Sequence, residues 1–169
     1  LTTIAVTDTT IDATSLASTI DSYDTINGGN TTGMTLASGA TIEVEANEIT
    51  EMLADETAGR LTISDQAITV NTEILFPGRI SVDTANLLEA TTSGVITASI
   101  TTTETVDELN TLTGTGNAYT ITVGTAQVTA AALNTVNAAT TVNVTATAVT
   151  QITGSAAELA TTYGGGITG

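Results

Sequence analysis

The chain has 169 residues, with 18 acidic residues against two arginines and a formal net charge of −16. Threonine supplies 42 residues, whereas cysteine, histidine, lysine and tryptophan are absent. This charge would repel a phosphate backbone and an anionic membrane surface, so the composition argues against nucleic-acid and membrane-surface binding. Because the common general base, the thiol nucleophile and the Schiff-base amine are all missing, we expect no enzymatic activity.

The first part of the chain, residues 1–83, is predicted to contain irregular acidic repeats. Segments 12–16 and 47–53 each open with a residue that can cap a helix N-terminus, so both predict short helices. Residues 60–64 alternate apolar and polar side chains, which predicts a strand. The Pro-Gly pair interrupts residues 72–79, which we interpret as a shortened repeat or a bend, the alternative being a boundary between two small domains.

The second part, residues 84–169, carries a clearer threonine- and alanine-rich repeat. Residues 105–112 (TVDELNTL) recur as 129–136 (TAAALNTV), then as 155–160 (SAAELA), with a weaker copy at 84–90 (TANLLEA). The repeat units are therefore 21 to 26 residues long, measured between the leucines that align the copies: Leu88, Leu109, Leu133 and Leu159. We expect these leucines to be buried at equivalent positions.

Each copy begins with a helix-capping residue and is preceded or followed by a β-branched run, as at residues 95–100, 119–123 and 141–145. A strand, a turn and a short helix in 21 to 26 residues match one coil of a solenoid. The sequence therefore predicts a repeat solenoid, mainly β: a right-handed parallel β-solenoid of about six or seven coils with a short helix in most of them. The alternative is an all-β solenoid. Residues 1–83 and 84–169 would form one continuous elongated array.

The two ends of the chain suggest further repeats or partners. Residues 167–169 (ITG) repeat residues 152–154, which directly precede Ser155, and the run at 1–6 has no capping helix before it. Because a terminal repeat without a polar cap leaves apolar surface and strand edges uncovered, we expect adjacent repeats or other copies of the chain to dock head to tail. No stretch is apolar enough to predict a membrane span.

The copies at 105–112 and 155–160, alternating with Thr/Val/Ile strands, resemble the repeats of very large secreted bacterial surface proteins. These include cyanobacterial cell-surface proteins and adhesins that also carry haemolysin-type calcium-binding repeats. The resemblance implies an extracellular or cell-surface location, a structural or adhesive role and a calcium-rich setting. The Gly-Gly-x-Gly-x-Asp nonapeptide of those proteins is absent here, so no calcium site is carried over.

Acidic residues provide the candidate metal site. Glu48, Glu51 and Asp55 are predicted along one face of a short helix, opposite its apolar residues Ile49, Met52 and Leu53. Hard oxygen ligands suit Ca²⁺ or Mg²⁺, so these three are candidate metal ligands, and Ca²⁺ is the candidate cofactor. The alternative is a solvated acidic face. A second, looser cation patch would contain four aspartates: Asp8, Asp12, Asp21 and Asp24.

We interpret the chain as a structural repeat segment of an extracellular surface, matrix or filament protein that assembles end to end. One alternative is an adhesive or ice-binding domain, in which threonine pairs on strands, such as Thr120/Thr122 and Thr145/Thr147, would align in a flat exposed rank. Another is a polysaccharide-acting enzyme, which would require a cleft holding two carboxylates.

Overall fold

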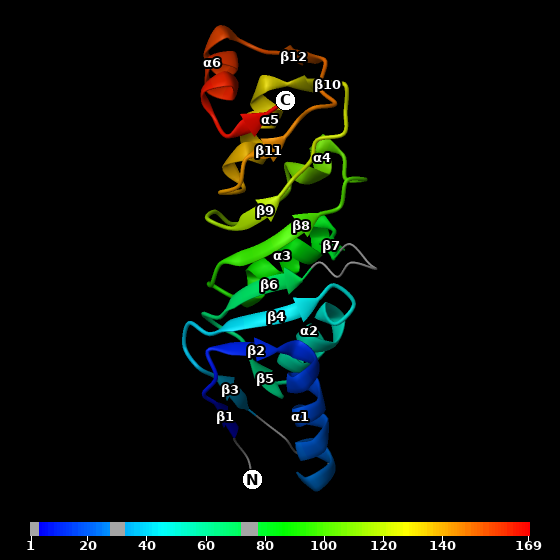
Figure 1. Cartoon of the computed structure of the whole chain (residues 1–169), viewed down its shortest axis with the longest axis vertical. Coiled ribbons are helices and arrows are strands. Elements are labelled where there is room, and N and C mark those ends of the chain that lie inside the picture. Colours follow the sequence, from blue (N-terminus) through cyan, green and yellow to red (C-terminus); the bar gives the residue numbers. More distant parts are fainter. Residues whose placement is uncertain (1–3, 28–32, 72–77) are drawn as a thin grey trace. The chain divides into compact units, whose positions relative to one another are not determined.

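The computed structural model describes residues 4–27, 33–71 and 78–169, apart from the side chains of residues 23–27 (Figure 1). The predicted interruption at 72–79 therefore lies largely outside the described residues. The chain divides into two compact units, residues 1–78 with 90–96 and residues 79–89 with 97–169.

The first unit contains two parallel three-strand arrangements. Strands β1 (Ile4–Val6), β3 (Met34–Leu36) and β5 (Leu61–Thr62) pair in that order, and so do β2 (Thr10–Asp12), β4 (Thr41–Glu45) and β6 (Ala67–Asn71). Helix α1 (Ala13–Asn27) follows β2, and helix α2 (Ile49–Thr57) follows β4. Successive strands along the chain thus belong alternately to the two sheets (Figure 1).

The core of the first unit follows from the register of β2, β4 and β6. Ile11, Ile42 and Ile68 are paired in register and are buried, and Val44 is paired with Val70 one step along. Because side chains alternate across a strand, the residues between them lie on the opposite face. That face carries Asp12 beside Glu43, two acids in register.

The second unit contains the remaining strands. Strands β7 (Arg79–Ile80) and β9 (Ala118–Thr120) both pair in parallel with β8 (Ile96–Ile100). Two further parallel pairs join β10 (Gln127–Thr129) to β12 (Gln151–Thr153) and β11 (Val144–Thr145) to β13 (Ile167–Thr168). The helices are α3 (Val82–Thr91), α4 (Val106–Leu109), α5 (Ala130–Ala138) and α6 (Ala156–Gly164).

Helix caps define the repeat of the second unit. The side-chain oxygens of Ser81, Thr105, Thr129 and Ser155 each accept a hydrogen bond from the backbone N–H three residues later, at 3.1 to 3.3 Å. At α4 and α6 the third residue is a glutamate that binds the backbone of the capping residue in return, which completes a capping box. The predicted helix starts at 105, 129 and 155 are therefore confirmed.

The leucines that align the repeats lie at the same distance from their helix caps in all copies but one. Leu88, Leu109 and Leu133 are buried, as predicted, whereas Leu159 is half-buried. Counted from the caps, however, the equivalent of Leu109 is not Leu88 but Ala85, four residues after Ser81. The alignment by leucine was wrong by nearly one helical turn in that copy, because both positions lie on the buried side of α3.

The predicted fold class, a mainly β parallel solenoid, is wrong, and so is the all-β alternative. The structure is an α/β fold with several parallel sheets and, among the described residues, six helices. Within the described ranges the helices contain 4 to 15 residues, whereas no strand exceeds 5. Helices α3 and α5 each bury one side, with Val82, Ala85 and Leu88 on α3 and Ala130, Leu133 and Val136 on α5, instead of forming the short corners that a mainly β structure requires. Helix α1 in particular exceeds the two or three turns expected from the sequence.

Candidate functional site

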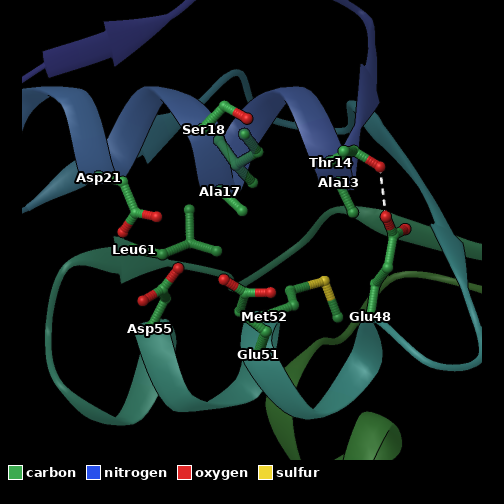
Figure 2. A pocket seen from close by; sticks show the side chains of 11 residues that line it. Ala13, Thr14, Ala17, Ser18, Asp21, Glu48, Glu51, Met52, Asp55 and Leu61 are labelled. Carbon is green, nitrogen blue, oxygen red and sulfur yellow. Dashed lines mark hydrogen bonds between the residues drawn. The ribbon is translucent and has the colours of Figure 1, made fainter.

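A small cavity of about 170 Å³ lies between α1 and α2 in the first unit (Figure 2). Figure 2 shows Asp21 on α1 above Asp55 and Glu51 on α2, with Leu61 and Met52 among them. The cavity therefore contains all three predicted metal ligands together with one aspartate from the second predicted patch: Asp21, Glu48, Glu51 and Asp55.

Glu48 connects the two helices. Its Oε1 accepts a hydrogen bond from the Thr14 hydroxyl on α1, drawn as the dashed line in Figure 2. Its Oε2 accepts the backbone N–H of Glu45 at 3.1 Å. Both carboxylate oxygens are thus engaged within the protein, and Glu48 acts first as a structural link at the start of α2.

Asp55 differs from the sequence-based expectation. It is only 4% exposed and lies on the buried side of α2 together with Ile49 and Met52, instead of on the opposite, solvated face. The Arg60 guanidinium forms an ion pair with its Oδ1. Gly59, at φ +70°, makes the turn after α2 that returns Arg60 to Asp55, a conformation that glycine adopts without steric cost. Arg60 is thus a residue of this site that the sequence analysis missed.

The acids of the first unit do not form one cluster. Asp8 and Asp12 line a separate groove of about 310 Å³ beside the start of α1, and the side chain of Asp24 lies outside the described residues. Within the part of the chain that the structure describes, no group of three or more acidic side chains is arranged to hold a metal ion. Ca²⁺ binding by Glu48, Glu51 and Asp55 stays a prediction.

The second unit contains a different polar cluster around Tyr119. This tyrosine is fully buried, and its hydroxyl has no hydrogen-bond partner within the described residues. Burial, and secondarily the negative charge of Glu89, raise the pKa of the Tyr119 hydroxyl far above its ordinary value. Glu89 itself accepts a hydrogen bond of 2.6 Å from Asn117 Nδ2. The cluster keeps Tyr119 protonated as a core residue.

The threonine pairs considered for an ice-binding surface are offset from one another. Thr122 is in register with Thr145, and Thr145 with Thr168, so these three threonines form one rank. Thr120 is in register with Ser99. Of the pairs 120/122 and 145/147, only Thr122 and Thr145 are in register with each other, so the two pairs do not align as the ice-binding hypothesis expects.

Comparison with protein-family models, with curated proteins and with solved structures finds no match for this chain. None of the helices in the described ranges is both long and apolar enough to cross a membrane. The function proposed below therefore depends on the composition and on the geometry of the two units.

Proposed function

We propose that this chain is a structural segment of an extracellular surface, matrix or filament protein, and that it assembles end to end with further copies or repeats. The main support for the proposal is that, among the described residues, the first and the last strands each have one edge without a partner strand. Among the described residues, β1 and β2 pair only with β3 and β4, whereas β12 and β13 pair only with β10 and β11.

The hydrogen bonds identify the groups that are available at these edges. The backbone N–H groups of Val144 and Ala146 donate to the carbonyls of Gly166 and Thr168, both at 2.7 Å. In a parallel ladder the intervening residue, Ile167, turns its own N–H and C=O to the other edge. At β2, Thr9 accepts from Thr41, so the same alternation leaves Thr10 facing outward. A strand at either edge would extend the parallel pairing.

Helix α6 provides a second line of support. Helix α5 buries Ala130, Leu133 and Val136, whereas Thr162 is the buried residue of α6. Leu159 is half-buried and Tyr163 is 78% exposed. The last helix thus leaves apolar side chains uncovered at the position where α5 buries its own against neighbouring elements.

The direct test is the mass of the chain in solution as a function of concentration. We expect the weight-average mass from sedimentation to rise above that of one chain, and negative-stain images to show linear assemblies. Ile167→Pro should abolish assembly, because it removes the outward N–H of β13 without removing a hydrogen bond to β11. Tyr163→Ser should weaken it, since the aromatic surface is lost.

Thr147→Pro is the matched control, because Thr147 occupies the second position of the turn closed by Val149 N–H and Ala146 O, where proline is favoured. This variant should assemble like the unmodified chain. A chain that stays monomeric at the highest attainable concentration, while hydrogen exchange shows β12 and β13 to be intact, would refute end-to-end assembly.

Divalent cations form the second part of the proposal. With a net charge of −16, the acids repel one another, and Ca²⁺ bound at any of them stabilises the folded chain by mass action. We expect a higher melting temperature in millimolar Ca²⁺ than in chelator at equal ionic strength. An unchanged melting temperature would remove Ca²⁺ from the proposal without affecting the assembly test.

An adhesive or ice-binding role is the alternative proposal, and its support is weaker because the single rank of Thr122, Thr145 and Thr168 is short. A thermal-hysteresis measurement on the purified chain separates the ice-binding alternative from a purely structural role.

A further inference from the structure

A groove of about 680 Å³ runs along strand β10 in the second unit. One wall is the segment 102–107, which leads into α4, and the other is formed by residues 124–129 with the start of α5. Its volume lies within the range of about 300–1,000 Å³ that ligand pockets occupy.

The groove exists because consecutive repeats differ in length. Ser99 is in register with Thr120, and the helix caps that follow are Thr105 and Thr129. The chain therefore reaches the cap through residues 100–104 in one repeat and through residues 121–128 in the next. Counted from the caps, β10 corresponds to residues 103–105, which form no strand, and among the described residues β10 pairs only with β12.

The open edge of β10 presents backbone groups to the groove. Gln151 N–H donates to the Ala126 carbonyl at 3.1 Å, which fixes the phase of the β10–β12 ladder. By the alternation of parallel ladders, the N–H groups of Gln127 and Thr129 point away from β12, toward the groove. The Gln127 carbonyl accepts a hydrogen bond of 3.2 Å from the Thr125 hydroxyl, which leaves a second lone pair for another donor.

The charge of the lining indicates the chemistry of the occupant. Glu104 and Asp107 are the charged residues among those that line the groove, and the remainder are mainly threonine, valine and small residues. Asp107 is exposed, and Glu104 is held at the groove by accepting the Val82 N–H at 3.1 Å. We propose that this groove binds an extended peptide carrying basic side chains, which adds a strand to the free edge of β10.

Strand addition explains both parts of the lining. Backbone hydrogen bonds to an open edge supply affinity for any extended chain, whereas the side chains that alternate along it supply selectivity. Here the acids select lysine or arginine side chains of the peptide. The threonines and Val106 contact the peptide side chains that lie between the basic ones. The inference does not depend on the end-to-end assembly proposed above, since the groove lies at β10 and not at β13.

The test uses the uniformly ¹⁵N-labelled full chain and the blocked peptide acetyl-Thr-Lys-Val-Lys-Val-Thr-amide at low ionic strength. With the peptide at about ten times its Kd, we expect the Gln127 and Thr129 amides to shift and to exchange with solvent about tenfold more slowly. The peptide with both lysines replaced by glutamate should produce neither effect.

Variants separate the two contributions. Asp107→Asn should weaken binding of the lysine peptide several-fold, whereas Asp83→Asn should not, although Asp83 is also exposed and occupies the same place in α3, two residues after its cap. Gln127→Pro removes an N–H that faces the groove and should abolish the protection of Thr129. Equal binding of both peptides, equal weakening by the two aspartate variants, or no protection of Gln127 and Thr129 would each overturn the proposal.

Discussion

Thr162 on α6 donates a hydrogen bond of 2.8 Å from its Oγ1 to Oδ1 of Asn134 on α5. Nδ2 of Asn134 in turn donates to the Glu158 carbonyl at 3.0 Å. Asn134 lies five residues after its helix cap, and both the oxygen and the nitrogen of its side-chain amide thus form hydrogen bonds with the next helix. Asn86 of α3 also uses both amide atoms in the next repeat, where it binds the carbonyl of Thr111 and the backbone N–H of Thr113 just after α4.

Asn110 occupies this position in α4, but its Oδ1 is buried and accepts no hydrogen bond within the described residues. The counterpart of Thr162 in α5, seven residues after the cap, is Val136, which has no donor. A buried acceptor without a partner costs about 1–3 kcal/mol of stability. The unpaired Oδ1 of Asn110 therefore makes the contact between α4 and α5 less stable than that between α5 and α6.

We predict that Val136→Thr changes the free energy of unfolding by less than about 1 kcal/mol, because the new hydroxyl reaches Asn110 Oδ1 and offsets its own burial. Val128→Thr is the control: Val128 is also buried, and a hydroxyl there should cost about 1–3 kcal/mol. Urea unfolding measures both. Equal losses in the two variants would show that Asn110 Oδ1 is not accessible to residue 136.

The loss of stability when a leucine is replaced by alanine should increase with the burial of that leucine. Leu109→Ala and Leu133→Ala should each lower the free energy of unfolding by about 2–5 kcal/mol, because each leaves a cavity in the core. Leu159→Ala, at a half-buried position, should cost less than either. Leu87→Ala, at a position 57% exposed, is the control, with an expected change of about 0.5 kcal/mol or less. A loss at Leu159 equal to that at Leu133 would indicate that α6 is covered in solution.

Gly94 should not tolerate a side chain. A Cβ at this position would lie 2.2 Å from the carbonyl oxygen of Gln66, which also accepts the Thr92 hydroxyl at 2.6 Å. Because the obstacle is backbone, Gly94→Ala should destabilise the chain by about 1–3 kcal/mol or more. At Gly164 a Cβ meets nothing within 4 Å, so Gly164→Ala should be neutral or stabilising. Thermal melting of both variants decides the matter, and a neutral Gly94→Ala would contradict the close packing.

The registered acids Asp12 and Glu43 should destabilise the sheet. Like charges directly opposite on neighbouring strands are unfavourable, and cross-strand pairs contribute roughly 0.2–1 kcal/mol. Glu43→Gln should therefore raise the free energy of unfolding by that amount at low salt and by less at 1 M salt, where the Debye length is about 3 Å. Glu45→Gln is the matched control, because Glu45 is in register with the neutral Asn71. An equal gain from both variants would indicate general charge repulsion.

The two capping boxes should make the free energy of unfolding depend on pH in the acidic range. Hydrogen bonds from the Thr105 and Ser155 backbones, and then from their hydroxyls, lower the pKa of Glu108 and Glu158 below 4.5. A carboxyl whose pKa is lower in the folded chain stabilises it above the unfolded value, and this contribution is lost as the pH falls from about 4.5 through the folded pKa. Carbon-13 titration should show the Glu108 pKa rising in Thr105→Ala while that of Glu158 stays low, and a shift of both would contradict local capping.

The sequence by itself determined three helix starts of the second unit, at 105, 129 and 155, and the burial of Leu88, Leu109 and Leu133, whereas it missed the start of α3 at Ser81. Capping is a local interaction: Thr105, Thr129 and Ser155 bind backbone groups three residues away, so the residues that carry the signal are neighbours in the chain. The runs predicted as strands at 95–100 and 119–123 overlap β8 and β9, since alternation of side chains requires no knowledge of the partner strand.

Only the tertiary structure decided the fold class, the setting of the acids and the groove. Local signals set where a helix begins but not how far it extends, because its length depends on the surface that its buried side finds, and this made the β-solenoid prediction wrong. Asp55 was expected on a solvated face, yet the turn at Gly59 returns Arg60 to it and permits its burial. The open edge of β10 depends on the register of one repeat against the next, a relationship between residues more than 20 positions apart that periodicity along a single chain does not contain.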